Sequence, residues 1–116
     1  MNDALVDNLV LGGVSPLTDV KTLASGQSVV RGQVLGKLTS GGNLAAYVST
    51  NNDGTGTAFS VAAETVDATG GAKPILFFRL AELSEDALVF SASGDSATEV
   101  VKDALAARSV FIKKTV

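Results

Sequence analysis

Residues 34–48 read VLGKLTSGGNLAAYV, which is two apolar runs separated by a short polar stretch with two glycines. Glycine readily adopts the positive φ that a tight hairpin turn requires. The pattern therefore predicts a β-hairpin with strands at residues 34–38 and 44–48 and a turn at residues 40–43.

Short apolar runs bounded by Gly, Asn, Asp and Ser continue on both sides of this hairpin. Such spacing is typical of a β-rich domain with tight turns, and a second turn is expected at residues 52–54, NDG. Residues 75–78, ILFF, are apolar at every position, which predicts a strand that is buried on both faces. The candidate strands outside the hairpin are residues 29–30, 59–63, 75–83 and 110–112.

One helix is expected at residues 97–108, where side chains with the i, i+3, i+4, i+7 spacing form one stripe. The members of this stripe are Ala97, Val100, Val101, Ala104, Leu105 and Arg108. Residues 96–99, SATE, have the form of a capping box, in which the Ser96 side chain accepts a hydrogen bond from the N3 amide and the Glu99 side chain accepts one from the Ser96 amide. Charge reversal at Glu99 is therefore expected to lower the stability of the helix.

The first 19 residues, MNDALVDNLVLGGVSPLTD, contain several large apolar side chains without a sustained period. Chain termini that fray are usually polar, so an apolar terminus implies a surface against which it lies. We expect a mainly β domain with one short α-helix at residues 20–116, preceded by an extended N-terminal arm at residues 1–19. The arm residues expected to bind a partner are Leu5, Val6, Leu9, Val10, Leu11, Val14, Pro16 and Leu17.

The composition is 46% hydrophobic and 18% charged over 116 residues, which suits one domain whose surface is partly covered by its own copies or by a larger partner. No apolar stretch approaches the ~18 residues of a membrane-spanning helix. Asp3 and Asp7 stand where a secretion signal carries Lys or Arg. We expect a protein that stays in the cytoplasm where it is made and does not enter a membrane.

Histidine and cysteine are absent, which removes the commonest general base and every thiolate nucleophile. The formal net charge is -3 and the basic residues are scattered, which argues against binding to a nucleic-acid backbone. Residues 49–60 resemble a calcium loop only in part, because Ser49 and Ser60 occupy its first and twelfth positions. We expect no catalytic site, no metal and no cofactor.

Residues 26–54 contain, in order, Gly26-Gln27, the segment VRGQVLG at 30–36, Tyr47 and Asp53-Gly54. This order resembles the head decoration proteins of lambda-type bacteriophages. The resemblance continues through residues 64–68, 76–88 and 110–113, and covers about residues 20–116. Two positions depart from the family pattern: residues 59–61 read FSV after the Asp-Gly turn, and Ala81 stands where a glycine often ends a strand.

The resemblance implies a small β-rich domain, of β-tulip or barrel-like form, that assembles as a homotrimer. It implies binding to the major capsid protein on the outer surface of the virion, at three-fold or quasi-three-fold sites, where it stabilises the expanded head against the pressure of packaged DNA. Deleting residues 1–13 is expected to leave the domain folded and to weaken capsid binding.

Two alternatives stay open at this point. A small carbohydrate-binding module displayed on a virion would also work through a surface, although the chain has one Tyr and no Trp. A lipoyl or biotinyl carrier domain is suggested by a Gly-x-Val-Leu sequence before a hairpin. Such domains display the modified lysine at a hairpin tip, whereas Lys37 follows Gly36 within a predicted strand.

Overall fold

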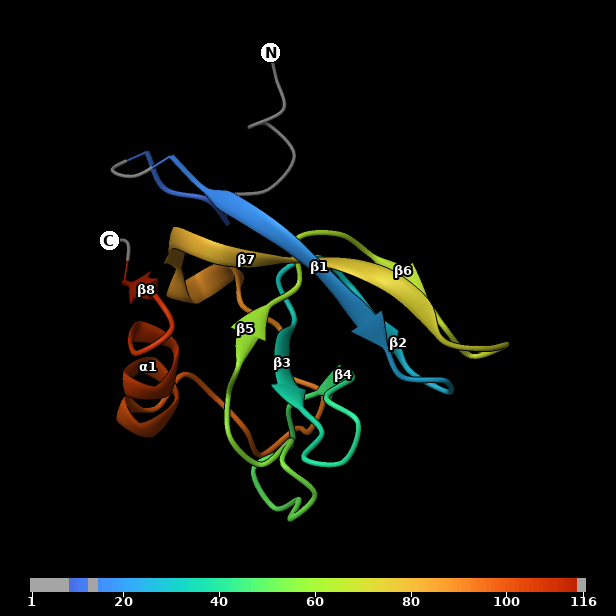
Figure 1. Ribbon diagram of the computed structural model, residues 1–116. Coiled ribbons are helices and arrows are strands. Elements are labelled where there is room, and N and C mark those ends of the chain that lie inside the picture. The colour runs from blue at the N-terminus through green and yellow to red at the C-terminus, as the bar shows by residue number, and fades with distance from the viewer. Residues whose placement is uncertain (1–8, 13–14, 115–116) are drawn as a thin grey trace.

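The fold is a six-stranded sheet with the strand order β5-β3-β4-β1-β7-β8, accompanied by one α-helix and a two-stranded β2-β6 pair (Figure 1). The computed structural model describes residues 9–12 and 15–114. The strands are β1 (Leu17–Leu23), β2 (Ser28–Val29), β3 (Val34–Lys37), β4 (Leu44–Ala46), β5 (Ser60–Val61), β6 (Val66–Asp67), β7 (Lys73–Ser84) and β8 (Val110–Lys113). The helices are the 3₁₀ turn η2 (Glu85–Ala87) and α1 (Glu99–Ala106).

The sheet nearly closes into a barrel. Within the sheet, β1 meets β4 through the parallel pairing of Leu23 with Leu44. At the β5 edge, the residue after β5 returns to β7, because Ala62 forms an antiparallel bridge with Phe77. The mainly β, barrel-like fold with one helix that the sequence predicts is confirmed.

The β3–β4 hairpin forms as predicted, with Leu35 opposite Ala46 and Lys37 opposite Leu44. Its turn uses the glycine conformation inferred from the sequence, since Gly41 has a φ of 86°. β3 and β4 are buried except at Lys37, so this hairpin supplies an interior wall of the barrel.

Two hydrophobic clusters share the long strand β7. Ile75 and Phe77 pack in one cluster, with Leu23, Val29, Leu35 and Leu44 among its other members. Phe78, Ala81 and Leu83 pack in the second, with Leu9, Tyr47, Val101, Leu105 and Val110. The prediction that this segment is buried on both faces is therefore confirmed, because each face serves a different cluster.

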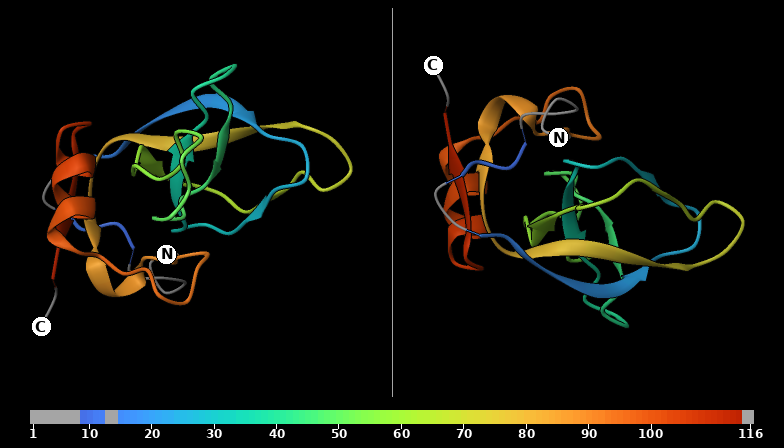
Figure 2. Two further views of the ribbon diagram at one scale, coloured as in Figure 1. Left: turned by 90° about the horizontal axis from the view of Figure 1, so that it is seen from below. Right: turned by 90° about the horizontal axis from the view of Figure 1, so that it is seen from above.

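Helix α1 stands beside β8 at the end of the molecule that lies away from the β2–β6 pair (Figure 2). Only part of the predicted stripe faces the core: Val101 and Leu105 are buried, whereas Val100 is 76% exposed. The predicted capping box is wrong. The N-cap is Thr98, whose side chain accepts the Val101 amide at 3.3 Å, and the helix begins at Glu99.

This cap gives a direct test. Thr98→Ala should lower the free energy of unfolding by about 1 kcal/mol, because the Val101 amide loses its acceptor. Ser96→Ala is the matched control and should change it by less than about 0.5 kcal/mol, since the Ser96 hydroxyl caps no amide of the helix. Urea unfolding of both variants measures the difference. A larger loss of stability for Ser96→Ala would support the capping box predicted from the sequence.

Most of the remaining predicted strands are confirmed in place, with ends shifted by one or two residues. β1 lies in the segment that the sequence placed partly in the arm, and no strand was predicted there. Its sequence, LTDVKTL, has apolar residues three apart, so it lacks the alternation that would indicate a strand. It forms a strand because it pairs with β7 over its whole length.

Candidate functional site

The segment at residues 9–12 is attached to β7 by backbone hydrogen bonds. The Ser84 amide donates to the Leu9 carbonyl at 2.7 Å, and the Leu11 amide donates to the Glu82 carbonyl at 2.8 Å. Val10 forms an antiparallel bridge with Leu83. The segment therefore extends the sheet on the same side of β7 as β1.

Leu9 is an anchor for this segment, because its side chain is only 1% exposed and belongs to a core cluster. Its two methyl groups lie 3.7 Å from the point that a Cβ on Gly32 would occupy, so Leu9 packs against the turn at Gly32. The expectation that Leu9 binds a partner is thereby corrected, since it fills the core of its own domain.

The other predicted arm residues have different surroundings. Val10 and Leu11 are half-buried, while Pro16 is exposed and Leu17, which begins β1, is 57% exposed. Leu5, Val6 and Val14 lie outside the described residues. The predicted deletion of residues 1–13 would remove Leu9 together with the segment before it, so it would damage the core.

Strand β8 lies on the other side of the same part of β7. Leu83 has Val10 beside it on one side and Ile112 beside it in the parallel β7–β8 ladder on the other. Lys113, one residue further, makes an ion pair of 3.1 Å with Glu82. Residues 9–11 and β8 thus flank one end of β7 on its two sides (Figure 1).

The turn that follows β7 is tied to the helix by an ion pair. Lys102 Nζ lies 2.7 Å from Glu85 Oε1, and both side chains are less than a third exposed. The Lys102 ammonium lowers the pKa of Glu85, and the same interaction raises the pKa of Lys102. Glu85 directly follows Ser84, whose amide donates to the Leu9 carbonyl.

Acid should weaken the fold through this ion pair. The Glu85 pKa lies below its ordinary value of 4.5, so the stabilisation is present above that pH and is lost as the pH falls through the lowered value. Lys102→Met should therefore be less stable than the wild type at about pH 6, and this difference in the free energy of unfolding should shrink as the pH falls below 4.5, which a second measurement at about pH 3 follows. Urea unfolding at the two pH values measures this, and a difference that does not change with pH would contradict it.

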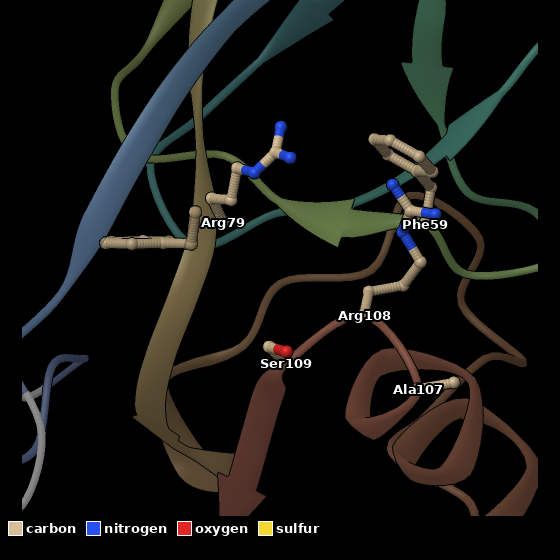
Figure 3. A pocket seen from close by; sticks show the side chains of 6 residues that line it. Phe59, Arg79, Ala107, Arg108 and Ser109 are labelled. Carbon is tan, nitrogen blue, oxygen red and sulfur yellow. The ribbon is translucent and has the colours of Figure 1, made fainter.

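Basic side chains that are far apart in the sequence meet around Phe59. The Arg108 guanidinium lies 4.1 Å from the centre of the Phe59 ring, and Lys37 Nζ lies 5.5 Å from it. Arg79 lines the adjoining pocket of about 240 Å³, where Figure 3 shows it with Arg108 and Phe59. Four separate segments supply these residues, so no local motif in the sequence could have predicted the cluster.

Exposed apolar side chains are the other conspicuous surface feature. Among the described residues, the large apolar side chains that are more than a third exposed are Leu17, Val20, Val30, Val89, Val100 and Phe111. Leu17 and Val20 both belong to β1. Isolated exposed apolar residues are ordinary, but two on one strand that has a partner on one side only over most of its length indicate a contact surface.

The geometry of the described residues gives little support to the two alternative functions. Phe111 is the one aromatic side chain of the described residues that is more than a third exposed, and Tyr47 is buried, so the described surface offers little platform for a sugar ring. Lys37 lies within β3, and Lys73 begins β7. Neither lysine is at the tip of a hairpin, where a carrier domain displays its modified lysine.

The described residues contain no group of three or more acidic side chains placed to hold a metal ion. In the same part of the chain, no helix is both long enough and apolar enough to cross a membrane.

Residues 4–110 match the family of the bacteriophage lambda head decoration protein D. The chain belongs to this family. Head decoration is a structural role, so this is a structural protein of a phage head and is associated with the capsid of the virion. Among individual curated proteins, none matches the chain.

Proposed function

We propose that this head decoration protein cements the expanded phage head. In this proposal three copies bind as a homotrimer to the outer surface, at three-fold or quasi-three-fold sites between copies of the major capsid protein. The bound trimers resist the pressure of packaged DNA. The finding that carries the proposal is family membership over residues 4–110, supported by the anchored N-terminal segment.

The anchor matters because a cementing protein must carry load. A binding segment that was joined only to a loose loop would be pulled away without engaging the folded domain. Here the chain is fixed at Leu9 by a buried side chain and at Leu9 and Leu11 by backbone bonds to β7. We propose that residues 1–8 and the exposed residues Pro16 and Leu17 contact the capsid on either side of this anchor.

Three such segments on one trimer would make attachment tight even if each one bound weakly. Linking binding segments raises the overall affinity by about 10²–10⁴-fold when all of them can engage together. The exposed apolar side chains and the high apolar content leave surface for contacts between copies. As a product of host translation, the protein would be made in the host cytoplasm before it meets the shell.

Co-sedimentation tests the proposal. Purified protein is mixed with expanded, undecorated capsids of its own phage and, as a control, with unexpanded procapsids. We expect saturable binding to the expanded shells alone, in multiples of three, together with greater resistance of those shells to heat. Absence of binding to expanded shells would overturn the proposal, and glycan-array binding would then favour the carbohydrate-binding alternative.

A further inference from the structure

Strand β1 has one free edge. It pairs with β7 from Leu17 to Leu23, but on its other side it meets β4 only at Leu23. Among the described residues, no strand lies against residues 17–22 on that side (Figure 1). An unpaired strand edge displays backbone donors and acceptors and can receive a strand from another chain.

The register shows which backbone groups face this edge. Leu76, opposite Val20, donates its amide to Glu64 and accepts the Ala63 amide at its carbonyl, so both of its groups point away from β1. Opposite residues of an antiparallel ladder either exchange both bonds or both point outward. Val20 therefore directs its amide and carbonyl to the free edge, where the amide is bonded only to the neighbouring Asp19 carboxylate at 2.8 Å.

Thr22 continues the same pattern. It lies opposite Pro74, which has no amide hydrogen to give to a ladder. Since Thr22 is two residues from Val20, its groups also point outward by the alternation of an antiparallel pair. The free edge thus presents the amide and carbonyl of Val20 and the amide of Thr22, while the Thr22 carbonyl lies where β1 meets β4 at Leu23 and Leu44.

Two of the devices that normally block strand addition are present on β1, namely Lys21 and a register shift at its start between Leu17 and Thr18, but from Thr18 to Thr22 the pairing with β7 is regular. Val20 is 54% exposed, and Thr18 and Thr22 are exposed with it. Natural edge strands are usually kept short or carry lysine, proline or a bulge. The opposite edge strand, β8, is protected in this way, because it has four residues and ends at Lys113.

We propose that an extended segment of the capsid shell adds as a strand to the free edge of β1. Its backbone would bond to Val20 and Thr22, and its alternate apolar side chains would cover Val20 and Leu17. The proposal rests on the proposed cementing function and names the second point of attachment. It differs from the arm contact, because here the domain receives a strand from the shell.

Three points favour the capsid shell as the occupant. Family membership associates the protein with a capsid. Residues 9–11 and β1 lie on the same side of β7, so a strand added to β1 would lie near the anchored segment. Pairing between the β1 edges of two copies would be self-complementary and would give a two-fold dimer, which does not fit three-fold assembly.

Val20→Pro tests the backbone contact, because it removes the outward amide without removing a bond to β7. Val20→Ala is the matched control, since it loses the apolar side chain but keeps the amide. We expect Val20→Pro to bind expanded capsids about tenfold more weakly than Val20→Ala, with similar melting temperatures. Equal binding by the two folded variants would overturn the proposal.

Hydrogen exchange of the wild-type protein decides the matter even if Val20→Pro fails to fold. On expanded capsids, the amides of Val20 and Thr22 should exchange at least about tenfold more slowly than in the free protein. Capsid binding without this protection would overturn the strand addition and leave the cementing function intact, whereas absence of wild-type binding would overturn both. A solution dimer that Val20→Pro abolishes would show that a second copy occupies the edge.

Discussion

A chain that lacks residues 1–8 should fold normally and lose most of its affinity for expanded capsids. The variant, Met followed directly by Leu9, keeps the core anchor and the backbone bonds of Leu9 and Leu11 to β7. We expect its melting temperature to stay within about 3 °C of the wild type and its capsid affinity to fall by about 100-fold or more, because the avidity of three segments is lost together. Co-sedimentation over a concentration series, beside thermal unfolding, measures both quantities.

Leu9→Ala in the full-length chain is the matched control, and it should show the reverse pattern. Removing a buried leucine side chain costs about 2–5 kcal/mol of stability, while residues 1–8 remain available. At a temperature where the variant is still folded, its binding should lie close to that of the wild type. Undiminished binding by the chain without residues 1–8 would contradict the proposed role of the segment.

Elements that depend on neighbouring residues were predictable from the sequence, whereas those that depend on distant residues were not. The β3–β4 hairpin, the buried half of β7 and the helix were predictable, because glycine turns, continuous apolar runs and helical spacing act within a few residues. Strand β1 was not predictable in this way. Leu23 is its only buried residue, so neither face has to be apolar and its sequence carries no alternation; only pairing with β7, fifty or more residues away, makes it a strand.

The same reasoning explains the mixed outcome at the N-terminal segment. Its apolar character correctly indicates that it lies against something, but the pattern cannot tell a surface of the same domain from that of a partner. Leu9 is buried because β7 and the turn at Gly32 form a site for it, and neither is near it in the sequence. For residues 1–8, a partner surface stays a prediction.

Gly54 illustrates a further limit, because its sequence context predicts a turn but not the closeness of its packing. Gly54 has a φ of 105°, and the carbonyl of Asp53 accepts the Thr39 amide at 2.9 Å, which holds the loop against the end of β3. A Cβ on Gly54 would collide with the Lys37 carbonyl and would lie 2.7 Å from the Thr39 nitrogen. The requirement for glycine is therefore both conformational and steric.

Gly54→Ala should consequently be among the most damaging single substitutions in the domain. We expect it to lower the free energy of unfolding by at least about 3 kcal/mol and the melting temperature by at least about 10 °C.

Gly41→Ala is the matched control, because Gly41 also has a positive φ but has no heavy atom within 4 Å of its Cβ position. It should cost only the conformational penalty of about 1–2 kcal/mol. Thermal and urea unfolding of the pair measure the difference, which isolates the collision with the end of β3. Equal costs at the two positions would mean that the loop moves away from β3 without loss, and that its contact with Thr39 contributes little to the stability of the fold.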